Sequence, residues 1–187
     1  MMADPSSSYI TRGGDKLLAA LEHFQLDMHG LICADLGSHA GGFVDCLLSR
    51  GASRVYSIDT GYGILAYRLR KDSRVVVMER TNALHAVLPE PVNLVTIDLG
   101  WTPQGKILPH VATLIRPGGW VLTLIKPQYE APSELLSEGV LPDEMVPQVL
   151  PIVLAEIARL GWQIVGTLPS PLRGHAGNQE HFALLKR

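Results

Sequence analysis

The sequence predicts an α/β domain whose mostly parallel, seven-stranded sheet has an antiparallel last strand and helices on both faces. Short apolar runs alternate with amphipathic segments from residue 31 to residue 160, which is the pattern of a doubly wound sheet. A glycine-rich turn at 37–42 joins the first apolar run to the helix that follows it. The last two apolar runs, 162–168 and 180–185, are joined by a segment too short for a crossover helix, so they should pair antiparallel.

The first strand, turn and helix predict where a ligand binds. The apolar run 31–34 is followed by Asp35, the glycine turn leads into an amphipathic helix at 43–50, and a β-branched run at 55–58 is followed by Asp59. Ligands of doubly wound sheets bind at the carboxyl ends of the strands, where glycine lets the backbone approach the ligand closely. The sequence therefore predicts a ligand site bordered by Asp35 and Asp59.

The glycine turn favours a ribose-bearing ligand without phosphates. A dinucleotide-binding turn needs a second glycine two positions after Gly37, where this chain has His39, and the phosphate-binding G-x-x-x-x-G-K-[ST] motif is absent. Asp59 lies about 20 residues beyond the first glycine, where an acid accepts both hydroxyls of a ribose. With Asp35 placed for a cationic amino-acid portion, the ligand that fits is S-adenosylmethionine. The alternative is an ordinary strand-to-helix turn with capping glycines.

Two further helices are predicted beside this unit. Apolar residues recur at helical spacing in 16–24, which places Lys16 in the first turn of a helix that packs beside the first strand. After Asp59, Gly61 and Gly63 begin a second helix, whose outer face is basic.

Three more predicted strands bring polar residues to the same rim of the sheet. One is followed by a polar segment that ends in Asn82, near where an adenine would lie. Asp98 follows the next strand, and Lys126 follows a fully apolar one. These strands are expected at 75–78, 94–97 and 120–125, with helices at 104–115, which 117–119 would end, and at 147–160.

A lysine at the end of a wholly apolar strand is not an ordinary surface lysine. Burial and the charge of Lys16 would lower the pKa of Lys126, whereas pairing with Asp98 or Glu180 would raise it, so the direction stays open. In either state the amine can bond a substrate hydroxyl, and when neutral it can take the proton as that hydroxyl attacks a sulfonium methyl. The structural alternative is a Lys126–Asp98 ion pair that closes the edge of the sheet.

Composition limits the classes of function. The 187 residues carry a net charge of -2 with a pI near 6.4, so a general polyanion binder is excluded and any nucleic-acid contact must be local. Cys33 and Cys46 form no C-x-x-C pair, and no histidines cluster at metal-ligand spacing, which favours buried thiols in a reducing cytoplasm and no metal. No apolar run approaches the roughly 18 residues of a membrane span.

Several ordered motifs resemble those of the FtsJ-like ribosomal RNA methyltransferases, most of all the TlyA branch, often labelled hemolysin A. They lie at 12–17, 35–38 with 41–43, 70–75, 79–82, 125–130 and 170–171 with 177–180. The resemblance covers 9–187 as one S-adenosylmethionine-dependent methyltransferase domain with a Rossmann-like class I fold, after a flexible tail at 1–8. It implies methyl transfer to a ribose 2′-hydroxyl of RNA, in particular ribosomal RNA. The family's Lys-Asp-Lys-Glu tetrad falls on Lys16, Asp98, Lys126 and Glu180.

The resemblance also implies how the ligands are held. The expected cofactor contacts are Asp35, Gly37, Ser38, Gly41, Gly42, Phe43, Asp59, Asn82 and Asp98. The expected RNA contacts rest instead on a local concentration of positive charge in a chain of net charge -2, with an ordinary solvated helix face as the alternative. They are Arg68, Arg70, Lys71, Arg74 and Arg80. No metal is implied.

The chain departs from the family pattern in three places. The TlyA branch usually carries an RNA-binding module before the catalytic domain, so we expect a separate RNA-binding subunit or a homodimer here. His39 and Ala40 replace small hydroxyl residues, and Gly100 and Trp101 replace a Ser-Phe pair. Two alternatives stay open: a cofactor- and RNA-binding module without turnover in ribosome assembly, and a methyltransferase of proteins or small molecules. A membrane-lysing activity is unsupported, because the sequence has no long apolar or strongly basic amphipathic segment.

Overall fold

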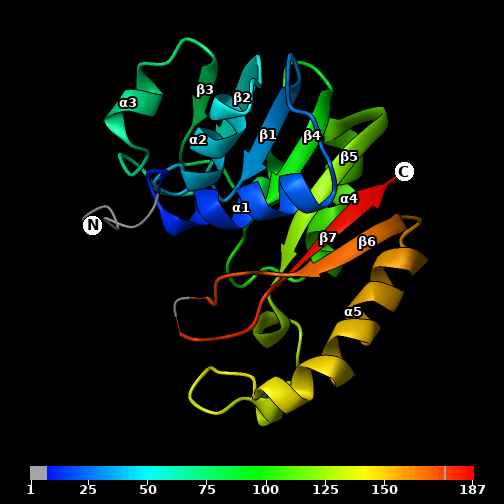
Figure 1. Cartoon of the computed structure of the whole chain (residues 1–187). Coiled ribbons are helices and arrows are strands. Elements are labelled where there is room, and N and C mark those ends of the chain that lie inside the picture. The colour runs from blue at the N-terminus through cyan, green and yellow to red at the C-terminus, as the bar shows by residue number, and fades with distance from the viewer. Residues whose placement is uncertain (1–7, 175) are drawn as a thin grey trace.

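The computed structural model describes residues 8–174 and 176–187, so the tail predicted at 1–8 lies, apart from Ser8, outside the described residues. A seven-stranded sheet in the order β3-β2-β1-β4-β5-β7-β6 forms its centre (Figure 1). The strands are β1 Ile32–Leu36, β2 Arg54–Ile58, β3 Val75–Met78, β4 Val92–Ile97, β5 Ile115–Ile125, β6 Gln163–Pro169 and β7 His181–Lys186. The helices are α1 Arg12–His23, α2 Gly42–Ser49, α3 Tyr67–Arg70, α4 Gln104–Leu114 and α5 Val146–Arg159.

The strand directions confirm the predicted sheet. β1 to β5 run parallel, and β7 lies antiparallel between β5 and β6. β1 pairs with β2 on one side and β4 on the other, so the chain reverses its direction of growth across the sheet at this point. Sheets of this kind bind ligands outside the carboxyl ends of the strands at such a switch point.

Two hydrophobic cores confirm that helices cover both faces of the sheet. α1 and α2 pack on the face seen in front in Figure 1, where Leu17 and Leu47 are buried. α4 and α5 contribute Ile107 and Val153 to the core of the other face. Complete burial of such side chains stabilises the domain by about 1.5–3 kcal/mol each.

The N-terminal helix begins earlier than predicted. α1 begins at Arg12 rather than at residue 16, so residues 12–15 form its first turn. Thr11 makes this possible, because its side-chain oxygen accepts a hydrogen bond from the Gly13 amide at 3.3 Å. Glycine also allows α1 to approach α2 closely, since a Cβ at Gly42 would lie 2.1 Å from Thr11 Oγ1.

Two other predicted boundaries were wrong. The helix predicted from Gly61 onward is only the single turn α3, because the Gly61 amide bonds Asp59 Oδ1 at 2.7 Å and holds the preceding segment as a loop. The segment 117–119 was predicted to separate a helix from a strand, yet it lies inside β5. A Cβ at Gly119 would lie 2.9 Å from the Asn93 carbonyl oxygen, so glycine lets β5 run close against β4 there.

The two cysteines are free and buried, as predicted. Burial raises the pKa of each thiol, Cys33 and Cys46, to about 12, so both are protonated and unreactive at neutral pH. Within the described residues, no helix is both long and apolar enough to cross a membrane.

Candidate active site

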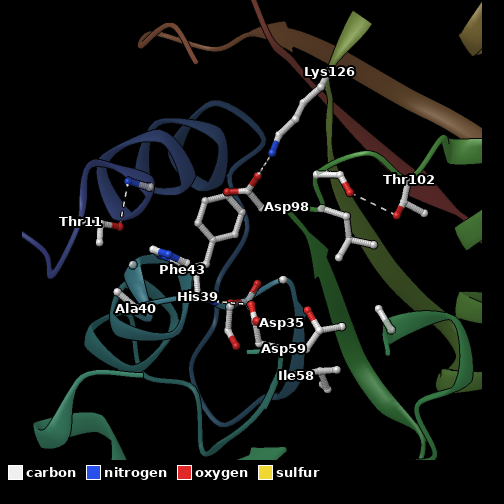
Figure 2. A pocket seen from close by; sticks show the side chains of 18 of the residues that line it. Thr11, Asp35, His39, Ala40, Phe43, Ile58, Asp59, Asp98, Thr102 and Lys126 are labelled. Carbon is white, nitrogen blue, oxygen red and sulfur yellow. Dashed lines mark hydrogen bonds and ion pairs between the residues drawn. The ribbon is translucent and has the colours of Figure 1, made fainter. Parts of the chain in front are cut away.

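A cavity of about 690 Å³ lies at the carboxyl ends of β1, β2, β4 and β5, where the sequence predicted the ligand site (Figure 2). It gathers residues from elements that are far apart in the chain. Of the predicted cofactor and tetrad residues, those lining it are Lys16, Asp35, Gly37, Ser38, Gly42, Phe43, Asp59, Asn82, Asp98, Lys126 and Glu180. Gly41 does not line the cavity, and neither do the five basic residues predicted to contact RNA.

Asp35 is fully buried and keeps one oxygen unbonded. Its Oδ1 accepts a hydrogen bond from Thr96 Oγ1 at 2.7 Å, whereas Oδ2 has no partner among the described residues. Burial raises the pKa of Asp35 to about 8, opposed by the Thr96 hydrogen bond and reinforced by the charges of Asp98 and Asp59. A buried orphan acceptor is costly, so the site is built for a donor that completes it, and a cationic donor would also favour the ionised carboxylate.

The backbone around Gly37 leaves no room for a side chain. Gly37 has φ +90°, and a Cβ there would lie 2.4 Å from the Asp98 carbonyl oxygen. The amides of Gly37 and Ser38 both donate to the Ile58 carbonyl, at 2.9 and 3.1 Å. The turn therefore links the ends of β1, β2 and β4 and keeps the floor of the cavity open.

The structure gives a reason for glycine at position 41 that does not involve the cofactor. It caps α2 at φ +103°, and a Cβ there would lie 2.2 Å from Leu69 Cδ1. The sequence could not separate this role from ligand binding, because the packing of Leu69 against the turn is a long-range contact.

Asp59 shapes the loop in which it lies. Its Oδ2 accepts from the His39 amide at 2.8 Å, and its Oδ1 accepts from the Gly61 amide at 2.7 Å (Figure 2). Each carboxylate oxygen can accept a second hydrogen bond, so Asp59 retains capacity for a ribose diol. Asn82 uses its side-chain oxygen to cap the turn that follows it, accepting from the Leu84 amide at 3.0 Å.

The four predicted tetrad residues form two ion pairs at the cavity. Lys126 Nζ lies 2.7 Å from Asp98 Oδ1, and Lys16 Nζ lies 2.6 Å from Glu180 Oε2 (Figure 2 shows the first pair). The Glu180 side chain is only 4% exposed, so both members of the second pair are held away from solvent. The structure thus brings together residues from α1, from the position just before β7 and from the ends of β4 and β5.

The charge of Lys126, which the sequence left open, is set by its neighbours. Burial lowers the pKa of Lys126, but the charge of Asp98, the hydrogen bond to Asp98 and the charge of Glu180 outweigh burial, so the pKa is raised. Lys126 is therefore an ammonium in the free protein at neutral pH. The ion pair considered as the structural alternative does form, and it lies in the cavity rather than on a solvated edge.

The five basic residues predicted to contact RNA lie around α3 and β3, outside the cavity. Three of them are in ion pairs, Arg68 with Asp45, Arg70 with Glu79 and Arg74 with Asp72. Lys71 lies 5.6 Å from the ring centre of Tyr67, and Arg80 lies 4.1 Å from that of Tyr62. Within the described residues, Lys71 and Arg80 thus contact aromatic rings and form no ion pair, whereas a carboxylate offsets the charge of each of the three arginines.

The structure adds three residues that the predicted sites lacked, of which two line the cavity. Thr96 orients Asp35 from β4. Arg12 begins α1 at the cavity and is exposed, with no ion pair within the described residues. Trp101 also lines the cavity although it is 83% exposed. Arg12 lies in the motif segment 12–17 and Trp101 at a departure from the family pattern, but no local pattern indicates that a side chain borders a cavity. The described residues contain no group of three His, Cys, Asp or Glu side chains that could hold a metal.

Comparisons with known proteins show which family the chain resembles. The model of the FtsJ-like methyltransferase family matches residues 9–187. The 16S/23S rRNA (cytidine-2'-O)-methyltransferase TlyA of Mycobacterium tuberculosis is 38% identical, over 100% of this chain and 71% of that protein. YqxC of Bacillus subtilis is 40% identical, over 92% of this chain and 63% of that protein.

A solved protein of Streptococcus thermophilus that carries a hemolysin name superposes with a TM-score of 0.93. It is 35% identical, and the match covers 97% of this chain and 68% of that one. The sequence relatives and the solved structure each match nearly the whole length of the chain. The chain belongs to the FtsJ-like methyltransferase family, in its TlyA branch.

Proposed function

We propose that this chain transfers a methyl group from S-adenosylmethionine to a ribose 2′-hydroxyl of ribosomal RNA. The observation that carries the proposal is the Lys126–Asp98 pair in the same cavity as Asp35 and Asp59. In the proposed reaction, the amine of Lys126 serves a substrate hydroxyl, and Asp35 and Asp59 serve a cationic, ribose-bearing cofactor. The Mycobacterium tuberculosis relative, which is named for cytidine 2′-O-methylation of 16S and 23S rRNA, supports the same reaction.

The cavity residues fit the cofactor chemically. The unbonded Oδ2 of Asp35 suits an ammonium group, and the spare acceptor capacity of Asp59 suits the two hydroxyls of a ribose. The open floor at Gly37 lets a ligand lie against backbone. Gly42, Phe43 and Asn82 line the remaining space around these groups. When bound, the cofactor supplies a methyl group activated by a positively charged sulfur.

Lys126 orients the nucleophile. Its ammonium, fixed by Asp98, donates a hydrogen bond to the substrate oxygen and holds it in position for attack. A second positive charge in the cavity would lower the pKa of Lys126 and bring it closer to that of a base that accepts the hydroxyl proton. Lys16 and Glu180 neutralise each other beside this centre, and so limit the net charge that the cavity must hold.

RNA would approach this cavity past positively charged residues. Arg12 lies at the cavity itself, and Lys71 and Arg80 lie on the α3 side of the domain. Arg68, Arg70 and Arg74 could add phosphate contacts only by sharing or leaving their carboxylate partners. We therefore expect Lys71 and Arg80 to contribute more to RNA binding than the three paired arginines.

The test is methyl transfer from tritium-labelled cofactor into small and large ribosomal subunits and into the naked ribosomal RNAs. The parent should label at least one of these substrates. Lys126→Ala should lose at least about 10²-fold in turnover while binding cofactor with nearly the parent's affinity. Lys106→Ala, which removes an exposed lysine of α4 outside the cavity, is the matched control and should keep full activity. An inactive parent that still binds cofactor and RNA would support a binding module without turnover instead.

A further inference from the structure

Glu130 joins the two loops from which the Lys126–Asp98 pair of Figure 2 comes. Its side-chain Oε1 accepts a hydrogen bond from the backbone amide of Gln104 at 2.8 Å. Gln104 begins α4 shortly after Asp98, and Glu130 follows soon after Lys126. The first amides of a helix have no acceptor within it, and Pro103 before α4 makes no side-chain cap. Glu130 therefore caps α4 from a different loop.

The same glutamine is also held by the strand that leads to Lys126. Gln104 is 4% exposed, and its side-chain Oε1 accepts a hydrogen bond from Thr123 Oγ1 at 2.8 Å. Thr123 is fully buried in β5, shortly before Lys126, whereas Glu130 comes shortly after it. Gln104 is thus bonded to the chain on both sides of Lys126. Thr123, Gln104 and Glu130 lie outside the cavity, so they act on it only through the backbone that they hold.

The strength of this link depends on the charge of Glu130. Burial raises the pKa of Glu130 to about 7, opposed by its hydrogen bond from Gln104 and reinforced by the charge of Glu156. Glu156 lies on α5 beside the start of α4, since a Cβ at Gly105 would lie 2.2 Å from its Oε1. The other titratable side chains described on the neighbouring segments are Lys106, Lys126, Tyr129, Glu134 and Arg159. An ionised carboxylate bonds a helix N-terminus more strongly than a neutral one does.

We propose that Glu130 is a positioning residue, which holds the loop after β5 against the start of α4 and so keeps Lys126 at bonding distance from Asp98. Its effect on the ion pair is a property of the free protein, whereas its effect on the rate rests on the proposed function. Trp101 and Tyr129 join the same two loops by a ring contact, and Glu130 adds a directional bond. Such a link matters because a misplacement of about 1 Å can cost about 10²-fold in rate.

Hydrogen exchange of the Lys126 ammonium tests the link without any substrate. Lys126 Nζ is bonded to Asp98 and its side chain is only 16% exposed, which slows exchange of its hydrogens with water. Nitrogen-15 NMR, with the signal assigned from Lys126→Arg, would measure this exchange. Glu130→Ala should speed it by about 2- to 10-fold, the factor that corresponds to the net loss of one hydrogen bond. Glu130→Gln should speed it less, because it loses the charge but keeps the acceptor.

Single-turnover rates at saturating RNA and cofactor give the second test. Glu130→Ala should lower the rate by about 10-fold or more, and the affinities for S-adenosylhomocysteine and RNA should stay those of the parent. The ratio of the parent rate to the Glu130→Gln rate should rise by at most about 5-fold as pH rises through about 7, because only the parent gains a charge there. The titration of Lys126 is common to both proteins and cancels in this ratio. In a Glu156→Gln background the rise should occur at lower pH, since a like charge is removed.

Glu134→Ala is the matched control. Glu134 is an exposed acid in the next turn, η3 Ser133–Leu135, so its loss should change neither ammonium exchange nor rate. Unchanged exchange in Glu130→Ala, with S-adenosylhomocysteine still bound, would overturn the link whatever the turnover. Equal effects of Glu130→Ala and Glu130→Gln would also overturn it, because the charge rather than the bond would then be responsible.

The two measurements also separate this proposal from the proposed function. Faster ammonium exchange in Glu130→Ala together with an inactive parent would reject the proposed function alone. An active parent whose ammonium exchange and rate are both insensitive to Glu130→Ala would reject the positioning role alone. If Glu130→Ala does not fold, Glu130→Gln, which keeps the shape of the side chain, decides by the same two measurements.

Discussion

Lys126 Nζ lies 2.7 Å from Asp98 Oδ1, because the two residues follow neighbouring parallel strands, β5 and β4, at the same rim of the sheet. Asp98 is a main reason why the pKa of Lys126 is raised despite burial. If Lys126 accepts the substrate proton, removing this carboxylate should change the pH at which the enzyme works.

Asp98→Asn should lower the pKa of Lys126, because it removes the attraction that stabilises the ammonium. The limb of the pH–rate profile that reports deprotonation of the base should therefore move to lower pH. The maximal rate should fall as well, since Lys126 loses its charged partner. Single-turnover rates measured at saturating RNA and cofactor would give both quantities. A limb at the same pH as in the parent would mean that Lys126 is not the titrating base.

The free energy of unfolding should fall as pH rises from about 4 to about 8. The pKa of Asp35 is raised to about 8 by burial, so the native state holds a proton that the unfolded chain has lost above about pH 4. The native state then binds more protons than the unfolded state, and Asp35 contributes a slope of at most about 1.4 kcal/mol per pH unit. Urea unfolding of the parent and Asp35→Asn at several pH values between 5 and 7.5 would measure it.

Glu130 provides the comparison for that experiment. Burial also raises the pKa of Glu130, to about 7, so its contribution has the same sign over a narrower range. Glu130→Gln should flatten only the part of the curve below about pH 7, whereas Asp35→Asn should flatten the curve up to about pH 8. A curve for Asp35→Asn that parallels the parent's would show that this carboxyl is already ionised in the native protein.

The cofactor assignment predicts selective stabilisation by ligands. S-adenosylmethionine and S-adenosylhomocysteine should raise the thermal midpoint, by the equivalent of about 2.7 kcal/mol at a hundredfold excess over Kd, whereas NAD should not. Asp59→Ala should remove most of this shift, because it loses a ribose acceptor and the bonds that hold His39 and Gly61. An equal shift with NAD would mean that the cavity is built for another ligand.

Charge reversal on the α3 side should weaken RNA methylation while leaving cofactor binding intact. Lys71→Glu should have a larger effect than Arg74→Glu on RNA affinity, because Arg74 is already paired with Asp72. For each lost phosphate contact the slope of log K against log salt should flatten by about 0.7–0.9. Arg159→Glu, the same change on exposed α5, should leave the slope unaltered. Equal effects of all three variants would indicate only a general change in net charge.

The sequence predicted those parts of the molecule that depend on local pattern. Strand order and the polar residue that follows each strand were enough to place Asp59, Asp98 and Lys126 at one cavity. The Arg68–Asp45 and Lys16–Glu180 ion pairs could not be predicted, because in each pair the two residues come from segments that meet only in the folded chain.

The same limit explains the boundaries that were wrong. Gly13 and Gly14 are poor helix formers in isolation, and only the Thr11 cap and contact with α2 make them the first turn of α1. The contact of Trp101 with Tyr129 likewise joins two different loops. The periodicity of apolar residues in a sequence does not indicate contacts between segments that are far apart in the chain.

The most direct test of the account replaces the target nucleotide by its 2′-deoxy analogue in an otherwise unchanged RNA substrate. The 2′-hydroxyl is the group that Lys126 is proposed to orient, and this group distinguishes RNA from DNA at a site. The substituted RNA should bind with nearly the parent affinity, since its phosphates and base are intact, and should accept no methyl group from labelled cofactor. Methyl incorporation that persists at that nucleotide would place the reaction on a base, and would contradict the assignment of Lys16, Asp98, Lys126 and Glu180 to ribose chemistry.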